Sequence, residues 1–253
     1  MTLESFQLTG KVALVTGSSR GLGAGIALAL AEAGAHVALH SSRAVPEAVS
    51  ARIAQTGVQT AAVVGDVSDA KVCASLVEQV VQRFGAIDIL VNNAGTIRRA
   101  PAVEHSDEDW QTVLDTNLSS VFYLSKAAGK HMLARGHGKI INIASLLTFQ
   151  GGITVPSYAA AKGGVGQLTK AFANEWASRG VNVNAIAPGY METDNTEALR
   201  ANPERARQIL ERIPAGRWGT PQDLAGAAVF LASGASDYVH GHVLVVDGGW
   251  LSR

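Results

Sequence analysis

Cysteine is nearly absent from this sequence, which has one, Cys73, among 253 residues. A single thiol excludes an intramolecular disulfide framework and suits a reducing compartment. Cys73 lies in the segment KVCASLVEQVV, where a helical period would bury it and no neighbour would favour the reactive thiolate. We therefore expect a structural thiol and not a nucleophile.

Neither sign of charge predominates, because Lys plus Arg and Asp plus Glu each number 21. This balance argues against nucleic acid or an anionic membrane as the main partner. No apolar run approaches the ~18 residues of a membrane span. The opening segment MTLESFQLTGK has an acidic residue where a signal peptide would carry basic ones. We expect a cytoplasmic protein that does not associate with membranes.

The sequence also lacks any group of His, Cys, Asp and Glu at metal-ligand spacing, and its seven histidines are dispersed. No metal is expected. Proline is scarce, with 7 residues, whereas glycine is frequent, with 27, and 47% of the residues are apolar. This composition is typical of a compact, turn-rich protein. At this length one domain, residues 1–253, is a better expectation than two.

Short apolar runs alternate with longer segments of helical period along the chain. Continuously apolar strands are typical of a parallel sheet covered on both faces. We therefore predict a single-domain α/β fold, a Rossmann-like doubly wound sheet of seven mostly parallel strands with helices on both faces. The expected strands are 11–17, 36–40, 60–66, 87–93, 139–145, 181–188 and 242–249. The expected helices are 21–33, 46–56, 69–84, 107–134 with a break near Asn117, 157–178 and 221–233.

Residues 189–220 interrupt this alternation with a long polar segment before the last expected helix. Long excursions that pass over the ends of strands often carry function. We expect a substrate loop or lid here, and a structural cap is the alternative.

A glycine-rich turn, TGSSRGLG, follows the first expected strand and opens the first helix. Its glycines are Gly17, Gly21 and Gly23. Glycine lets the backbone turn sharply and approach a pyrophosphate, whose charge is stabilised by the free amides at the start of the helix. This context predicts a dinucleotide site, against the alternative of a plain strand-to-helix turn.

The end of the second strand bears on the choice of dinucleotide. A reader of the ribose 2′-hydroxyl would be an Asp or Glu at this position. The sequence has His40, Ser41, Ser42 and Arg43 there, and Arg20 lies inside the glycine loop. Two guanidinium groups near the ribose suit a 2′-phosphate. We expect NAD(P)(H) as the cofactor, with NADP(H) favoured over NAD(H).

Tyr158 and Lys162 stand four residues apart in the helix-forming stretch SYAAAKG. This spacing places them on one helical face. A nearby ammonium would favour the phenolate and lower the pKa of the tyrosine. The alternative is an ordinary, half-buried aromatic residue.

An ordered set of motifs resembles the short-chain dehydrogenase/reductase family over nearly the whole chain. The set comprises TGSSRGLG, Asp66, NNAG at 92–95, Asn117, Ser145, Tyr158 with Lys162, and PGYMET at 188–193. The resemblance implies an oxidoreductase that is usually a homotetramer. The cofactor-binding residues expected from it and from the glycine loop are Gly17, Ser19, Arg20, Gly21, Leu22, Gly23, Ser41, Ser42, Arg43, Asp66, Val67, Asn93, Ala94, Gly95, Tyr158, Lys162, Pro188, Gly189, Met191 and Thr193.

The chemistry of that family assigns four catalytic residues. Tyr158 would act as the acid in reduction and the base in oxidation, and Lys162 would tune it and bind the ribose. Ser145 would donate a hydrogen bond to the substrate oxygen. The resemblance implies that Asn117 holds a water linking Lys162 to solvent. Read singly, Ser145 could instead cap a helix and Asn117 could break one.

A narrower likeness is to members of that family that interconvert a keto and a hydroxy group on a deoxy sugar acid. It rests on NAGTIRRAPA, LLTFQGGITVPSYAAAK, AIAPGYMETDNTEALRA, RIPAGRWG and DGGWLSR. A sugar-acid carboxylate would favour an arginine fork. Arg98 or Arg99 is the first candidate, and Gln150 and Arg217 are weaker ones.

Two other functions remain open from the sequence. NLSSVF, YAAAKGG and PAGR would also suit a 3-oxoacyl-[acyl-carrier-protein] reductase of the same family. A non-catalytic NAD(P)-binding regulator could use the same fold. The presence of Ser145, Tyr158 and Lys162 together argues against a regulator.

Overall fold

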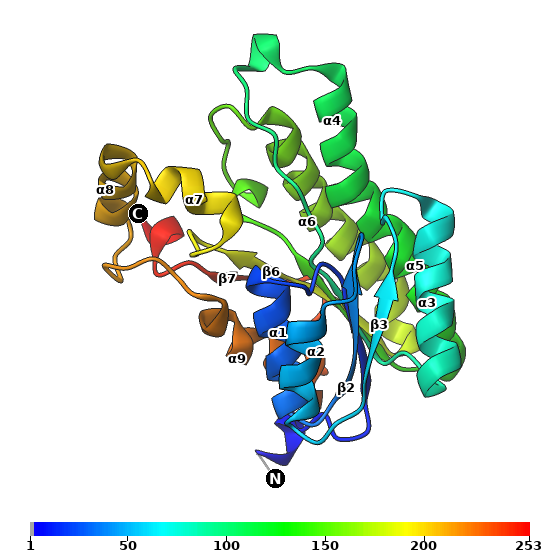
Figure 1. Cartoon of the computed structure of the whole chain (residues 1–253). Coiled ribbons are helices and arrows are strands. Elements are labelled where there is room, and N and C mark those ends of the chain that lie inside the picture. The colour runs from blue at the N-terminus through cyan, green and yellow to red at the C-terminus, as the bar shows by residue number, and fades with distance from the viewer. Residues whose placement is uncertain (1–2) are drawn as a thin grey trace.

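Seven short apolar segments form one sheet in the computed structural model, which describes residues 3–253 (Figure 1). Met1 and Thr2 lie outside the described residues. They begin the segment that is not expected to be a signal peptide. The strands are β1 (Val12–Val15), β2 (His36–Ser41), β3 (Thr60–Val64), β4 (Ile89–Asn92), β5 (Gly138–Ile143), β6 (Val181–Pro188) and β7 (Val243–Val246). Their order is β3-β2-β1-β4-β5-β6-β7, and each neighbouring pair is parallel. The predicted fold class is confirmed.

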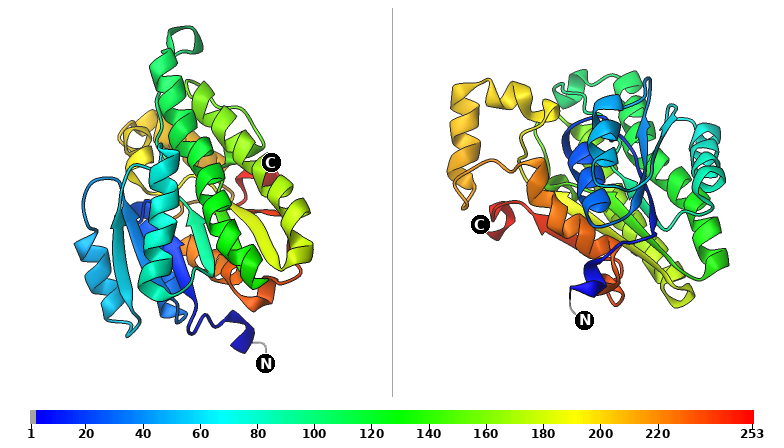
Figure 2. Two further views of the ribbon diagram at one scale, coloured as in Figure 1. Left: turned by 90° about the vertical axis from the view of Figure 1, so that its right-hand side faces the viewer. Right: turned by 60° about the horizontal axis from the view of Figure 1, so that its bottom comes forward.

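Helices cover both faces of the sheet (Figures 1 and 2). One face packs against α1 (Gly21–Glu32), α2 (Glu47–Ala54) and α9 (Ala225–Ala232). The other packs against α3 (Ala70–Phe84), α5 (Ser120–Arg135) and α6 (Pro156–Trp176). Single turns of 3-10 helix lie at Glu4–Phe6, Ala102–Glu104, Leu146–Thr148, Ala177–Arg179, Pro221–Leu224, Gly234–Ser236 and Trp250–Ser252. No helix within residues 3–253 is both long enough and apolar enough to cross a membrane.

The alternating side chains of the strands feed two separate cores. In β1, Ala13 and Val15 join the cluster under α1 and α9, whereas Val12 and Leu14 join the cluster under α3 and α5. All four are almost fully buried. Because successive residues of a strand point to opposite faces, a sheet covered on both sides requires an unbroken apolar run. This explains why the strand segments show no polar alternation.

The helix expected over 107–134 changes its period near Asn117 instead of stopping. It consists of α4 (Asp107–Leu114), a π-helical turn at Asp115–Ser119, and α5. Ser106 caps the start of α4 by accepting a hydrogen bond from the backbone N–H of Asp109. A π-helical turn inserts extra backbone into a helix and often marks a functional site. Here it directs the buried Asn117 toward the sheet.

Residues 189–220 contain two helices that the sequence analysis did not predict. They are α7 (Asp194–Arg200) and α8 (Pro203–Arg212), and they lie to one side of the sheet in Figure 1. Asn202 caps α8 by accepting a hydrogen bond from the N–H of Arg205, and Pro203 occupies its first turn. Ile209 and Ile213 of this segment pack with Leu146 and with Trp250 of the C-terminal end. This separate small core holds α8 in place.

Candidate active site

One cleft of about 520 Å³ opens at the carboxyl ends of the central strands. This edge is where doubly wound sheets bind their ligands. Eighteen of the sequence-predicted site residues line it: Gly17, Ser19, Arg20, Gly21, Leu22, Gly23, Ser41, Ser42, Arg43, Asp66, Val67, Asn93, Ala94, Gly95, Arg98, Tyr158, Lys162 and Thr193. Seven further residues line it that were not predicted as site residues: His40, Thr96, Thr112, Thr116, Ile143, Asp194 and Asn195.

Glycine is required at two positions of the loop that precedes α1. A Cβ atom on Gly23 would lie 2.3 Å from the carbonyl oxygen of Gly17 and 2.4 Å from Nδ2 of Asn93. Gly17 has φ +62°, and its Cβ would lie 2.9 Å from Cα of Ala94. The turn is therefore packed so tightly that only glycine, which has no Cβ atom, fits at these two positions. The first amides of α1 have no intrahelical partner and are available to a pyrophosphate.

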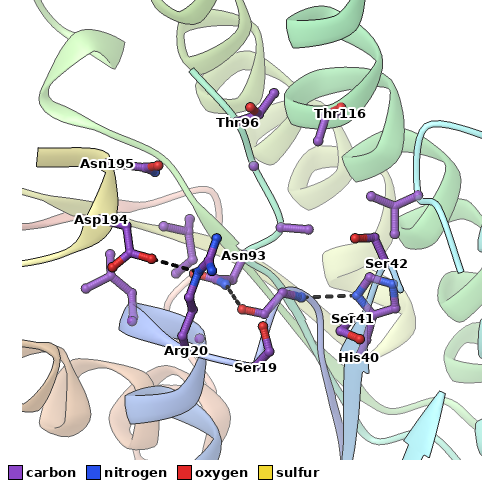
Figure 3. A pocket seen from close by; sticks show the side chains of 18 of the residues that line it. Ser19, Arg20, His40, Ser41, Ser42, Asn93, Thr96, Thr116, Asp194 and Asn195 are labelled. Atoms are coloured by element: carbon purple, nitrogen blue, oxygen red, sulfur yellow. Dashed lines mark hydrogen bonds and ion pairs between the residues drawn. The ribbon is translucent and has the colours of Figure 1, made fainter. Parts of the chain in front are cut away.

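The NNAG turn holds this glycine loop in place. The backbone amides of Asn93 and Ala94 donate to Oγ1 of Thr16 at 2.9 and 3.0 Å. The side-chain amide of Asn93 donates to the carbonyl oxygens of Thr16 and Gly17 at 2.8 and 3.1 Å. Figure 3 shows Asn93 beside the glycine loop. These contacts join the ends of β1 and β4. A dinucleotide fits the resulting cradle of backbone amides.

The arginines near the predicted ribose site have different surroundings. Arg43 is exposed on the cleft rim and forms no ion pair within residues 3–253. Arg20 pairs with Asp194, the first residue of α7, with Nε 2.8 Å from Oδ2 (Figure 3). Both partners are largely exposed, so solvent screens the pair and it contributes little to stability. Arg20 is therefore free to exchange Asp194 for a bound phosphate at small cost.

Tyr158 and Lys162 lie on one face of α6, at the inner end of the cleft. Nζ of Lys162 is 5.6 Å from the centre of the Tyr158 ring and donates to the carbonyl oxygen of Ile143 at 2.5 Å. Lys162 is 4% exposed, and burial lowers its pKa to about 8. The ammonium is thus held by one backbone carbonyl and has no carboxylate partner within the described residues.

The pKa of Tyr158 departs from the sequence argument. Burial raises it, while the hydrogen bond with Ser145 and then the charge of Arg99 lower it. Lys162, whose Nζ lies 5.6 Å from the centre of the ring, is not among the groups that lower it. In the protein alone, the phenol is therefore kept protonated.

Ser145 has both of the roles that the sequence left as alternatives. Its Oγ accepts a hydrogen bond from the N–H of Leu147 at 3.2 Å and caps the turn Leu146–Thr148. The same hydroxyl is hydrogen-bonded to Tyr158. The capping bond fixes the serine rotamer, and this presents the hydroxyl to the tyrosine.

Asn117 uses its side chain to hold the loop after NNAG. Its Oδ1 accepts from the backbone N–H of Thr96 at 2.8 Å, and its Nδ2 donates to the Thr96 carbonyl oxygen at 2.8 Å. Gly95 packs directly on this amide. Asn117 does not line the cleft itself. A water held by Asn117 stays a prediction.

Arg98 and Arg99 separate in the structure. Arg98 lies on the cleft wall, where Nε is 3.1 Å from Oδ1 of Asp109 and Nη1 is 3.0 Å from Oγ1 of Thr96. Arg99 has no carboxylate partner within residues 3–253. It donates to the carbonyl oxygen of Asn195 at 3.4 Å and lowers the pKa of Tyr158. Arg99 itself is not part of the cleft wall.

Other predicted residues lie away from the cleft. Arg217 forms two 2.7 Å bonds to Asp223, which lower the pKa of that carboxyl well below its usual range, and Gln150 is not part of the cleft wall. Pro188, Gly189 and Met191 are also not part of the cleft wall. Gly189 packs on Asp247, and Met191 is buried and bridges to Gly219.

Two further sequence predictions, a structural thiol at Cys73 and no metal, concern residues outside the cleft. Cys73 is fully buried and donates to the carbonyl oxygen of Val67 at 3.1 Å, and burial raises the pKa of its thiol to about 12. A thiol in this environment is unreactive. Within residues 3–253, no three His, Cys, Asp or Glu side chains are grouped so that they could hold a metal.

Comparisons with known proteins agree with this geometry. A family model described as enoyl-(acyl carrier protein) reductase, a division of the short-chain dehydrogenases/reductases, matches residues 17–251. The 2-dehydro-3-deoxy-D-gluconate 5-dehydrogenase of Pseudoalteromonas atlantica is 57% identical over 253 residues, covering 99% of this chain and 100% of that protein.

Two solved structures have the same fold. A protein of Agrobacterium tumefaciens with bound NADP, provisionally named a 2-deoxy-D-gluconate 3-dehydrogenase, has a TM-score of 0.92 and 54% identity over 98% of this chain and 99% of its own. The gluconate 5-dehydrogenase of Burkholderia cenocepacia, in complex with NADP and tartrate, has a TM-score of 0.95 and 42% identity over the whole of both chains. The resemblance found in the motifs is confirmed, and the chain belongs to the short-chain dehydrogenase/reductase family.

Proposed function

We propose that this protein is an NAD(P)-dependent oxidoreductase that interconverts a keto and a hydroxy group on a deoxy sugar acid. The observation that carries the proposal is that Tyr158 and Lys162 line the same cleft as the glycine cradle, with Ser145 interacting with Tyr158 beside it. The relative from P. atlantica bears the name of such an activity over its full length. The sequence likeness to family members that act on deoxy sugar acids supports the same substrate class.

The chain's own residues handle the proton and the substrate oxygen. When bound, the nicotinamide supplies a hydride to the carbonyl carbon or takes one from the alcohol. Tyr158, whose hydroxyl is kept protonated by burial, donates its proton to the substrate oxygen in reduction and regains it in oxidation. Ser145 donates a hydrogen bond to the same oxygen. The ammonium of Lys162 stabilises the negative charge left on the phenolate.

We assign the substrate carboxylate to Arg99. A carboxylate forms its strongest contacts with a guanidinium that has no competing acid. Arg98 already has Asp109 as a partner, whereas Arg99 contacts only a backbone carbonyl of α7 and acts on Tyr158. Bound at Arg99, a sugar acid would have its carbon chain directed toward the tyrosine hydroxyl.

Acyl-carrier-protein substrates are the second candidate, because the matching family model is described by that chemistry. An acyl thioester offers no carboxylate to Arg99 and requires an apolar channel. The lining of this cleft is rich in polar residues, such as Thr96, Thr112 and Thr116. The sugar acid is therefore the better match. A non-catalytic regulator would have no use for the linked Ser145 and Tyr158.

We propose NADP(H) as the preferred cofactor. The end of β2 has no acidic residue, and Arg20 and Arg43 line the same cleft. Solved relatives from A. tumefaciens and B. cenocepacia carry NADP. A 2′-phosphate would find Arg43 unpaired and Arg20 held by a weak, exposed ion pair.

We propose that residues 189–220 act as a lid of this single domain. Thr193, Asp194 and Asn195, at the start of α7, line the cleft. Asp194 and Asn195 also contact Arg20 and Arg99, one at each end of the site. Movement of α7 would therefore act on the cofactor and the substrate together.

We propose a cytoplasmic homotetramer, as is usual in the family. A shallow apolar surface on α5 and α6 supports this assembly, because it includes Phe122, Tyr123 and Leu168, and Phe122 is 39% exposed. Exposed patches of this kind mark association surfaces. The single buried cysteine suits a reducing compartment.

Replacing Tyr158 with Phe should lower kcat by about 10²- to 10⁴-fold, because general acid–base catalysis is lost. The Kd for NADPH should stay within about twofold, since the ring remains. Steady-state kinetics and fluorescence titration check both values. Tyr190→Phe, in the aromatic cluster with Trp218 and Trp250, is the matched control. Turnover like that of the wild type in Tyr158→Phe would rule out this mechanism.

Arg99→Ala should raise KM for a keto-deoxy sugar acid by roughly tenfold or more, because a charged hydrogen bond contributes about 1.5–3 kcal/mol. KM for a neutral diketone should not change. Arg98→Ala should have a smaller effect on both, since its partner is Asp109. An equal loss on the acid and the diketone would show that Arg99 does not bind the carboxylate.

Arg43→Ala and Arg20→Ala should each weaken NADPH binding by roughly tenfold, since each removes about 1.5 kcal/mol of charged hydrogen bonding. NADH binding should not change, because NADH lacks the 2′-phosphate. Titration of both cofactors by fluorescence measures the ratio. Parallel losses for NADPH and NADH would mean that the arginines support the loop and do not read the phosphate.

Lys162→Met should abolish turnover but stabilise the fold at pH 7. The folded-state pKa of Lys162, about 8, lies below its ordinary value of 10.5, so the unfolded chain binds more protons between these values. Wild-type stability therefore rises with pH across this window. The increase in the free energy of unfolding that Lys162→Met gives should be largest below pH 8 and should shrink toward pH 10. Urea unfolding at fixed protein concentration checks it, and a pH-independent difference would contradict it.

A further inference from the structure

The buried imidazole of His40 connects the glycine loop to the ends of two strands. His40 is the fifth residue of β2 and is 1% exposed. The backbone N–H of Gly17 donates to Nδ1 at 3.1 Å, as Figure 3 shows. Nε2 lies 2.9 Å from the carbonyl oxygen of Gly65, just after β3. The ring therefore spans β1, β2 and β3 at the edge where the cleft opens.

These partners determine the protonation state of the ring. A backbone N–H can only donate and a carbonyl can only accept. Nδ1 must therefore be bare, and Nε2 must carry the hydrogen. This is the neutral tautomer, and burial, which lowers the pKa of His40, favours the same neutral form. The ring acts as a fixed spacer with one acceptor end and one donor end.

The backbone of His40 reinforces the same connection. Its N–H donates to Oγ of Ser18 at 2.9 Å, and its carbonyl oxygen accepts from the N–H of Ser18 at 2.9 Å. From the opposite side, Asn93 donates to the carbonyl oxygen of Gly17. Gly17 is thus held at its N–H by His40 and at its C=O by Asn93.

Holding Gly17 matters because a glycine has more backbone freedom to lose than any other residue. In this turn Gly17 must adopt φ +62°. The free amides that can meet a pyrophosphate belong to the following residues, in the first turn of α1. Their direction depends on the Gly17 turn. A loop ordered before the ligand arrives binds it more tightly.

We propose that His40 is a positioning residue for dinucleotide binding, whose neutral ring fixes the glycine loop in its binding conformation through the Gly17 amide. It touches neither the reacting atoms nor the substrate. The proposal rests on the proposed function only in that the ligand is a nicotinamide dinucleotide. It assigns a cofactor-affinity role to a side chain that the motif pattern leaves out.

Two near-isosteric substitutions separate the two ends of the ring. In His40→Asn, the side-chain oxygen can take the place of Nδ1 and still accept from Gly17. In His40→Gln, the amide nitrogen can take the place of Nε2 and still donate to Gly65, but Gly17 loses its acceptor. Each variant keeps one of the two ring contacts, so a general packing defect should affect both alike.

We expect the Kd for NADPH, measured by fluorescence without substrate, to stay within about threefold for His40→Asn and to rise about tenfold for His40→Gln. At saturating cofactor, kcat should be unchanged in both. Equal changes in Kd that follow equal losses of thermal stability would overturn the proposal, as would normal binding by His40→Gln. Failure of sugar-acid turnover in the wild type would count against the proposed function alone, because this Kd needs no substrate.

Hydrogen exchange on the wild-type protein tests the proposal without any variant that must fold. If His40 orders the loop, the amides of Thr16, Gly17 and Ser18, which all have acceptors in the structure, should already be protected in the cofactor-free protein. NADPH should then add little protection at Gly17. Fast exchange at Gly17 that slows only when NADPH binds would overturn the proposal.

Discussion

The hydrogen bonds between the NNAG turn and the end of β1 are the constraint on which the rest of the site depends. Parallel strands β1 and β4 lie side by side, and the chain leaves them in different directions. The side-chain amide of Asn93 links the two strand ends by donating to the carbonyl oxygens of Thr16 and Gly17. Oγ1 of Thr16 accepts hydrogen bonds from the backbone amides of Asn93 and Ala94. Because Gly23 packs against the same Gly17 carbonyl and Asn93 amide, α1 can begin only where this junction allows. The cofactor cradle is therefore a consequence of how two strands end.

The proposed catalytic groups are held by contacts that are ordinary features of a fold. Ser145 caps a turn, Asn117 fastens a π-helical turn to Thr96, and Lys162 bonds to a strand carbonyl. Each of these contacts satisfies a backbone group that burial would leave unpaired. The same contacts fix the rotamers needed for proton transfer. A structural role and the proposed catalytic role are compatible at these positions. The desolvation energy of the buried Lys162 ammonium is offset by the packing of the sheet around it.

Motif order in the sequence was enough to predict the sheet and the placement of the glycine loop, Tyr158 and Lys162 around one cleft, because these depend on local spacing and strand burial. It was not enough to separate Arg98 from Arg99, since the distinction arises from Asp109 on a helix that the loop reaches only in three dimensions. Arg217 was a candidate substrate ligand because it is a cation in the polar segment. In the structure both of its terminal nitrogens donate to Asp223. The helices α7 and α8 escaped prediction although Asn202 and Pro203 give a recognisable start signal, because the segment as a whole is polar.

The start of α7 contacts residues at both ends of the proposed site. Asp194 meets Arg20 beside the cofactor cradle, and one residue later the Asn195 carbonyl meets Arg99 near Tyr158. A phosphate that takes Arg20 leaves Asp194 without its cation and weakens the hold on the start of α7. A carboxylate at Arg99 then competes with the Asn195 carbonyl for the same guanidinium. With the proposed ligands at Arg20 and Arg99, both would act on one helix terminus. Cofactor binding and substrate binding would then be linked through α7 without any contact between the two arginines.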